Sequence, residues 1–250
     1  MSIIHKINCA HCGAPIQFDP GELVTTCNYC GFTQLIKTGQ PFNFGHSMLL
    51  NEYNPAQVEN IVHEWMRTGF IKPGNLEKAS KIVEKSLTYI PFWVLEVKVN
   101  SSYKGIFERL TPPVVKEGKI QKNYDWLILA RKATQFPTRE YNVPLEGKIL
   151  FDFRKIEGFA KVLNSEIEKS EAVEKSKQQI EAHHKFLAKQ EVDKIVEMQT
   201  NFRFGDVVYL HAPIWFITYE YEKKQYRIFL DGASGLVIKG DIPALKSSLF

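Results

Sequence analysis

The sequence predicts an α+β fold, in which a small N-terminal module is joined through a helical hairpin to an antiparallel β body. Three observations lead to this prediction. All four cysteines fall in two close pairs within the first 30 residues, strand-like alternation fills residues 89–160 and 205–250, and residues 165–201 contain no glycine or proline. We therefore expect a β body with two related hairpins and one long amphipathic helix.

The cysteines follow the pattern C-x2-C-x14-C-x2-C, with Cys9, Cys12, Cys27 and Cys30 as its members. Four thiolates suit tetrahedral Zn²⁺ at about 2.3 Å per bond, and a site filled entirely by cysteine is structural because no position is left for water. Iron is the chemical alternative in the same ligand set. Paired short spacings favour a metal over a disulfide framework. Residues 1–38 are therefore predicted to form a zinc ribbon, with His11 as an exposed turn residue.

The composition is that of a globular chain. It has 250 residues, of which 44% are hydrophobic and 24% charged, and its net charge is +4. This charge falls short of the strongly basic signature of a dedicated nucleic-acid binder. There is no apolar run of about 18 residues and no visible secretory signal, so we expect no transmembrane segment. Cysteines available for metal binding also suit a reducing compartment, and a cytoplasmic location is expected.

Residues 39–52 are predicted to be a linker that packs against another part of the chain, because Phe42, Phe44 and Met48 are apolar. Residues 53–88 are predicted to form a helical hairpin. Its first helix begins at the N-cap Asn54, which is followed by proline and, at the third position, by Gln57. Its second helix is expected to open after 73–75 and to run to about Leu87.

Residues 89–160 are predicted to be the β-rich part of the body. The strand 91–99 should be buried at its start and then alternate, 100–102 should form a turn, and 103–110 should return. Further strands are expected at 125–130 and 149–153. Residues 161–204 are predicted to form a long helix, with Val173, Ile180 and Leu187 spaced by seven. Residues 205–250 should complete the body as a β-meander.

An internal echo suggests that the two hairpins are related. Pro91-Phe92-Trp93 and Pro213-Ile214-Trp215 head strands of similar pattern. We expect the hairpins to pair in one sheet or to pack across a pseudo-twofold axis, with the long helix covering one sheet face. Core packing is the expected role of both tryptophans.

The ribbon and the C-terminal strands together resemble a group of prokaryotic zinc-ribbon proteins. These proteins often carry a label referring to the primosomal helicase or to TFIIB-type zinc ribbons. The C-terminal residues that match their pattern are Pro213, Trp215, Tyr219, Tyr221, Tyr226, Asp231, Gly232, Ser234, Gly235, Val237, Gly240 and Pro243. The resemblance also implies a peripheral association with membrane-remodelling machinery. The helicase label does not transfer, because the chain has no G-x-x-x-x-G-K-[ST] loop.

The sequence contains no recognisable catalytic constellation. His63-Glu64 begins a zinc-protease motif, but position 67 is arginine, and adjacent His183 and His184 should point to different faces of a helix. Three functions therefore remain. The leading prediction is a non-catalytic zinc-binding adaptor that mediates protein–protein interaction.

One alternative is a nucleic-acid-binding zinc ribbon, and the other is an enzyme with an unrecognised site. The nucleic-acid alternative needs a basic patch flanked by aromatic side chains, for which the candidates are Lys119, Lys122, Arg131, Lys132 and Arg139, beside Tyr124, Trp126 and Phe136.

Overall fold

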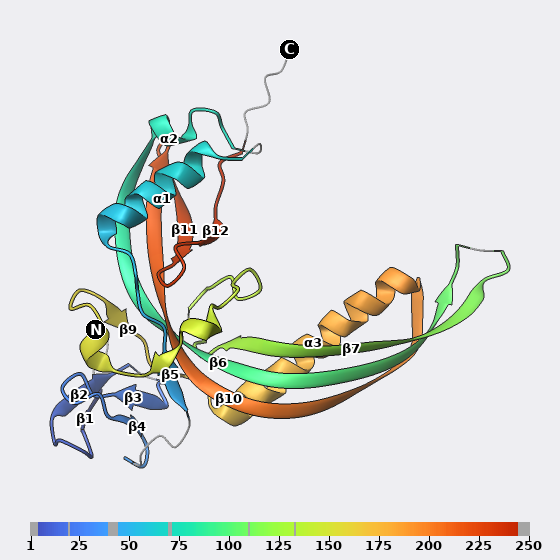
Figure 1. The fold of residues 1–250 in the computed structure, drawn as a ribbon, viewed down its shortest axis with the longest axis horizontal. Coiled ribbons are helices and arrows are strands. Elements are labelled where there is room, and N and C mark those ends of the chain that lie inside the picture. The colour runs from blue at the N-terminus through green and yellow to red at the C-terminus, as the bar shows by residue number, and fades with distance from the viewer. Residues whose placement is uncertain are drawn as a thin grey trace.

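The computed structural model describes residues 5–19, 21–39, 45–69, 72–109, 111–132 and 134–244. Its centre is an antiparallel pair of unusually long strands, β6 (Ser80–Phe107) and β10 (Lys194–Tyr221), each of 28 residues. Both strands bend sharply, so that the molecule divides into a compact head and a protruding arm (Figure 1). We define the arm as residues 97–125 and 169–206, as far as they are described, and the head as the rest of the large sheet with the elements packed on it.

Two small sheets form the N-terminal module, which we call the ribbon (residues 5–39). In the first sheet β1 (His5–Asn8) pairs with β2 (Pro15–Phe18), and in the second β3 (Val24–Thr26) pairs with β4 (Thr33–Leu35). Each pair is antiparallel and spans only three or four residues. Sheets of this size bury too little apolar surface to be stable alone, so they need support from a metal or from the head.

The large sheet has eight strands. Five follow the order β12-β11-β10-β5-β8, and β6 pairs with β10, β7 and β9. The remaining bounds are β5 (His46–Met48), β7 (Val114–Leu129), β8 (Ile149–Leu150), β9 (Lys161–Val162), β11 (Lys224–Asp231) and β12 (Val237–Gly240). Short 3-10 turns at Leu145–Gly147 and Phe153–Lys155 flank β8.

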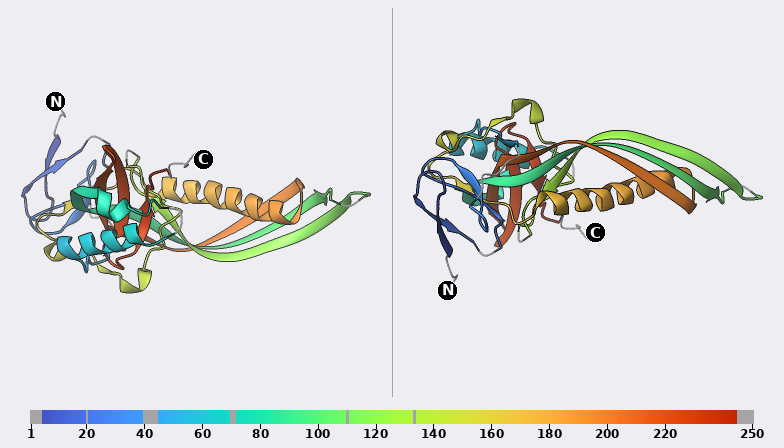
Figure 2. Two further views of the ribbon diagram at one scale, coloured as in Figure 1. Left: turned by 90° about the horizontal axis from the view of Figure 1, so that it is seen from above. Right: turned by 90° about the horizontal axis from the view of Figure 1, so that it is seen from below.

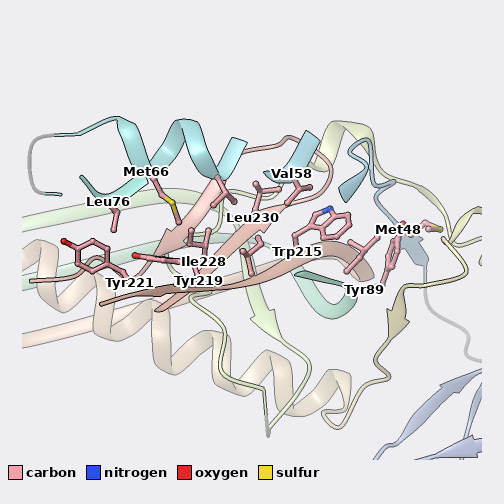
Figure 3. Close-up of a cluster of buried hydrophobic side chains, with 13 residues drawn as sticks. Met48, Val58, Met66, Leu76, Tyr89, Trp215, Tyr219, Tyr221, Ile228 and Leu230 are labelled. Carbon is pink, nitrogen blue, oxygen red and sulfur yellow. The ribbon is translucent and has the colours of Figure 1, made fainter. Parts of the chain in front are cut away.

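Helix α1 (Pro55–Arg67) covers one face of the head sheet. Its Val58, Val62 and Met66 pack against a cluster that includes Trp215 and Leu230 (Figure 3). Full burial of each such side chain contributes about 2 kcal/mol. The predicted cap is confirmed: the Asn54 side chain accepts two backbone N–H groups, and the Gln57 side chain accepts from the Asn54 N–H.

The opposite face of the head sheet is covered in part by the segment 134–147. Its Phe136 and Tyr141 pack on Phe92, Ile214 and neighbouring side chains of the sheet. Both faces of the sheet are therefore buried in this part of the head, and β6 is buried without interruption from Leu87 to Leu95.

The arm consists of β7, β6 and β10 with a single long helix, α3 (Lys169–Glu191), on one face. The buried positions of α3 recur every four residues, at Ala172, Ser176, Ile180, His184 and Ala188. From residue 96 onward β6 alternates between exposed and buried positions, since only the helix-facing side is covered. Figure 2 shows α3 lying along the strands as they extend away from the head.

The bend between head and arm coincides with a register shift in β10 between Phe204 and Val207. Such a β-bulge adds a residue to one strand and bends it. Gly205 lies within it, and a Cβ at this position would meet the Glu96 carboxylate oxygen at 2.6 Å. The sharp bend therefore has a local cause in the sequence.

The α+β prediction is wrong, because the molecule is mostly β and its three α-helices contain 13, 4 and 23 residues. The second helix of the predicted hairpin shrinks to α2 (Leu76–Ala79), after which residues 80–88 join β6 and pair with β10. The predicted helix over 161–204 ends at Glu191. Lys194 begins a strand in which Phe202 and Phe204 pack below α3, whereas Gln199 and Asn201 are exposed.

The turn predicted at 100–102 is also wrong, because β6 runs straight through it. Ser101 is buried under α3 and bonded there, and β6 stays paired with β7 as far as Phe107 and Val114. The echoing segments do share one sheet, since Pro91 pairs with His211 and Pro213 with Tyr89. The Trp93 and Trp215 side chains are both buried in the core, as expected.

Candidate metal site and its attachment to the head

The four cysteines come together within the ribbon. Their Sγ atoms all lie within 4.8 Å of one another, with 3.7 Å between Cys9 and Cys30 and 3.7 Å between Cys12 and Cys27. Tetrahedral bonds of 2.3 Å imply sulfur–sulfur separations of about 3.8 Å. The four cysteines could therefore hold one metal ion. The described residues place no other ligand in this group, so the site is closed.

The two knuckles that present the thiols have the same local structure. The Gly13 N–H donates to the Cys9 carbonyl and the Gly31 N–H to the Cys27 carbonyl, both at 2.9 Å. Both glycines have φ of +72°, in the left-handed region that glycine adopts without strain. The C-x2-C-G spacing thus produces two equal turns that face each other.

The thiols differ in their surroundings. Cys9 and Cys27 are buried, whereas Cys12 and Cys30 are exposed. Burial opposes ionisation of Cys9, but N–H groups of Cys12 and His11 and the neighbouring thiols lower its pKa to about 7. Burial, together with the surrounding thiols, raises the pKa of Cys30 to about 12. His11 is exposed and stacks on Phe32, as a turn residue and not as part of the four-cysteine group.

The ribbon is attached to the head by a buried ion triad. Arg131 lies between Glu22 of the ribbon, at 3.1 Å, and Glu166 of the head, at 3.3 Å. Asn164 donates to the Glu22 carboxylate, and the Leu23 N–H donates to the Ser165 carbonyl at 2.8 Å. Burial raises the pKa of Glu22, although Asn164 and Arg131 oppose this shift.

A chain of hydrogen bonds makes a second connection between ribbon and head. Thr33 of β4 contacts His46 Nδ1 at 3.0 Å, and His46 Nε2 contacts His211 Nδ1 at 2.8 Å. His211 Nε2 lies 2.9 Å from the Leu163 carbonyl oxygen. Because that carbonyl can only accept, His211 Nε2 carries a proton, His46 Nε2 donates to His211, and Thr33 donates to His46.

Both histidines in this series of hydrogen bonds are held neutral. Burial lowers the pKa of His46 to about 2, with a further contribution from His211, and burial lowers the pKa of His211 to about 4. Neither histidine belongs to a local sequence motif. They lie 165 positions apart, and no local pattern could have paired them.

His183 and His184 were predicted to point to different faces of the helix, yet both rings lie against the ring of Tyr124 and their own centroids are 6.2 Å apart. His183 packs against the rings of Tyr124 and Trp126, whereas His184 is fully buried beneath α3. His184 Nδ1 lies 2.7 Å from Ser101 Oγ, and its Nε2 lies 2.9 Å from the Tyr124 hydroxyl. A serine bonded to a histidine can be a nucleophile and its base, but Ser101 is only 2% exposed and also contacts Thr200. This cluster therefore fastens α3 to the strands β6 and β7 of the arm.

The residues proposed for a basic patch do not gather on one surface. Successive strand residues point to opposite faces, so the pairs Ser102–Lys119 and Val99–Lys122 place the two lysines on opposite sides of the arm. Arg131 is buried between two carboxylates. Tyr124 and Trp126 pack below α3.

Fold and site together define a mostly β protein with a four-cysteine ribbon at its N-terminal end. Comparison with protein-family models, with curated proteins and with solved structures found no match. No helix among the described residues is long and apolar enough to cross a membrane.

Proposed function

We propose that this protein is a non-catalytic, zinc-binding adaptor whose arm contacts a protein partner. The observation that carries the proposal is the arm itself, in which a three-stranded sheet extends far beyond the head and is covered on one face only. A sheet of this kind has no use in stabilising the head. It is suited to present a long surface to another molecule.

The open face of the arm is polar throughout its middle. Its twelve central side chains are exposed and include four cations, two carboxylates and no apolar group: Lys98, Asn100, Ser102, Lys104, Glu117, Lys119, Gln121, Asn123, Glu197, Gln199, Asn201 and Arg203. Mixed charges and amides favour a partner with a polar, hydrogen-bonding surface. They disfavour a lipid or an apolar groove.

Both edges of the arm sheet offer unpaired backbone groups. Among the described strands, β7 pairs with β6 alone, and β10 has no second partner before Tyr209. An open strand edge can accept an added strand from another protein. The edge strand β7 carries Lys116, Lys119 and Lys122. Charged side chains on an edge strand oppose pairing between identical chains but still permit pairing with a partner of complementary charge.

We assign zinc to the cysteine site and a structural role to the ion. Four thiolates in a closed tetrahedral arrangement are the usual ligand set for zinc, and iron is the alternative. The thiolates suit a reducing compartment such as the cytosol. We propose no nucleic-acid function, because Lys119 and Lys122 lie on opposite faces of the arm and Arg131 is buried between two carboxylates.

The proposal is tested by photo-crosslinking in the cells that produce the protein. A photoreactive residue at Gln121 on the arm should capture a defined protein, whereas the same residue at Lys224 on the head should not. Equal capture at both positions, or none at Gln121, contradicts the proposal. So does turnover of nucleotides, esters or peptides by the pure protein that a point change outside the cysteines abolishes.

A further inference from the structure

The uncovered part of the head sheet contains a hollow of about 360 Å³. It lies on the face opposite α1, where β6, β10 and β11 form the floor and β9 with Thr134 forms a wall. The segment 134–147 covers the sheet only as far as this hollow. Its volume is within the range of small-molecule sites.

The floor of the hollow combines apolar rings with free hydroxyl groups. Phe216 and Phe229 are neighbours across β10 and β11, and their rings meet edge to face with centroids 5.3 Å apart. The hydroxyls of Ser86, Thr88 and Thr218 project from the same face. Within the described part of the chain, none of these three hydroxyls has a protein hydrogen-bond partner.

The rim carries more positive than negative charge. Arg227 and Lys161 are exposed at two sides of the hollow, and Glu84 is the one carboxylate in its lining. No ion pair joins any of these three side chains to another described residue. Thr218 pairs with both Glu84 and Arg227, so the two opposite charges lie one strand apart on either side of β10.

These features together select the chemistry of a ligand. A wholly apolar molecule would leave three hydroxyls without partners, which costs free energy for each buried polar group. A bare inorganic anion would leave the half-buried ring of Phe216 in contact with water. A small organic anion with a ring satisfies both parts, because its ring covers Phe216 and its charge meets Arg227 and Lys161.

We propose that this hollow binds a small organic anion that carries an aromatic ring, of the size of a monocyclic phosphate ester or carboxylate. The guanidinium and ammonium groups take the anionic group, the two phenylalanines take the ring, and the hydroxyls take its polar substituents. The Glu84 carboxylate accepts a hydrogen bond from a hydroxyl or amine group of the ligand. The site is separate from the arm and from the four cysteines, so it does not depend on the adaptor function.

The wall of the hollow is also connected to the ribbon. Leu163 lines the hollow, and its carbonyl oxygen accepts a hydrogen bond from His211 Nε2. His211 is the second histidine in the series of hydrogen bonds that begins at Thr33. The Leu163 N–H in turn donates to the Tyr89 carbonyl of β6 at 3.0 Å. The position of this wall is therefore fixed from both sides.

The test uses phenyl phosphate as the probe and the full-length protein. Calorimetry and methyl spectra of the leucine and threonine side chains should show saturable binding with a Kd of about 1 mM or tighter. Arg227→Ala and Lys161→Ala should each weaken binding about tenfold, the effect of one charge-assisted hydrogen bond. Thr218→Trp should abolish binding by filling the hollow.

The matched control is Lys224→Ala, on the same strand as Arg227 but on the opposite face, and it should leave Kd unchanged within about twofold. Inorganic phosphate and benzyl alcohol should each bind at least tenfold more weakly than phenyl phosphate. The proposal is overturned if phenyl phosphate does not saturate. It is equally overturned if the Arg227 and Lys161 variants, with unchanged thermal unfolding, bind like the parent, or if inorganic phosphate binds as well as the ester.

Discussion

The same two strands behave differently in the head and in the arm. In the head, β6 is buried on both faces from Leu87 to Leu95, and two separate apolar clusters lie above and below it. In the arm, the side chains of the same strand alternate between buried and exposed. The buried ones contact Ile180 and Ala188 of α3 and its C-cap residue Val192. The two strands stay paired in both regions, on either side of the bulge at the bend, but what packs on them differs.

Local stability therefore depends on what covers the faces of the sheet, and the hydrogen-bond ladder of β6 and β10 does not set it. The arm sheet is covered on one face only, and α3 contacts it through two small apolar clusters and the polar cluster around His184. We expect the head to unfold as a cooperative unit, whereas α3 opens from the arm at lower free energy. The ribbon belongs to the head in this comparison, since Val24 packs with Trp93 and Tyr209.

The largest effect is expected from loss of the metal. Cys27→Ser removes a buried ligand and should reduce the bound ion from one per chain to none, as native mass spectrometry would measure. Metal binding stabilises isolated zinc modules by about 10 kcal/mol or more. Hydrogen exchange should show that β1–β4 lose protection, while the amides of β6 and β10 in the arm keep theirs.

The matched control is Tyr29→Ser in the same knuckle, at a side chain that is 75% exposed, and it should retain the ion. A collapse of head, arm and ribbon in one transition would show that the ribbon is integral to the whole sheet. It would then be wrong to treat the arm as an independent unit.

Acidification should lower the free energy of unfolding of the head more than that of the arm. This effect should be smaller than that of metal loss. The pKa values of His46 and His211 are lowered from 6.5 to about 2 and about 4, so the unfolded chain binds more protons than the folded one below pH 6.5. The stability that these neutral histidines contribute is present above that pH and is lost as the pH falls toward 4. Each contributes a slope of up to about 1.4 kcal/mol per pH unit.

Urea unfolding of the head between pH 6.5 and 4.5 measures this slope. Glu22, whose pKa is raised by burial, changes stability in the opposite direction and offsets part of it. His46→Gln keeps hydrogen-bonding groups but does not titrate, and should reduce the slope by about half. An unchanged slope in this variant would mean that the two histidines are not held neutral in the folded head.

Features set by neighbouring residues were predictable from the sequence. Three features were predicted correctly: the two C-x2-C-G knuckles, the cap at Asn54, and the strand that begins buried and then alternates. Each of them depends on residues that are close together in the sequence. The centre of helix α3 was placed correctly because Val173, Ile180 and Leu187 follow helical spacing, but both ends were wrong, since the helix predicted over 161–204 begins at Lys169 and ends at Glu191.

Features set by distant pairing were not predictable. Residues 80–88 have helix-compatible spacing, yet they pair with 214–221, and this pairing overrides local preference. After Glu191, the spacing of three between Val192, Ile195 and Met198 was interpreted as a continuing helix. Residues 198–204 instead alternate with a period of two and belong to strand β10. The ion triad at Arg131 and the pair His46–His211 join segments more than 30 positions apart.

The smallest expected effect tests how α3 is held. Tyr124→Phe removes the hydroxyl that contacts His184 Nε2 at 2.9 Å and leaves this nitrogen buried without that partner. The cost should be about 1 kcal/mol, and it should fall on the arm alone. Hydrogen exchange of the α3 amides should accelerate about fivefold at 25 °C, because 1 kcal/mol corresponds to that factor, whereas global unfolding in urea should change little. Tyr226→Phe in the head is the matched control and should leave α3 unchanged. If the two variants affect α3 equally, the polar cluster does not hold the helix, and the stability of the arm must be attributed to Ile180 and its apolar neighbours.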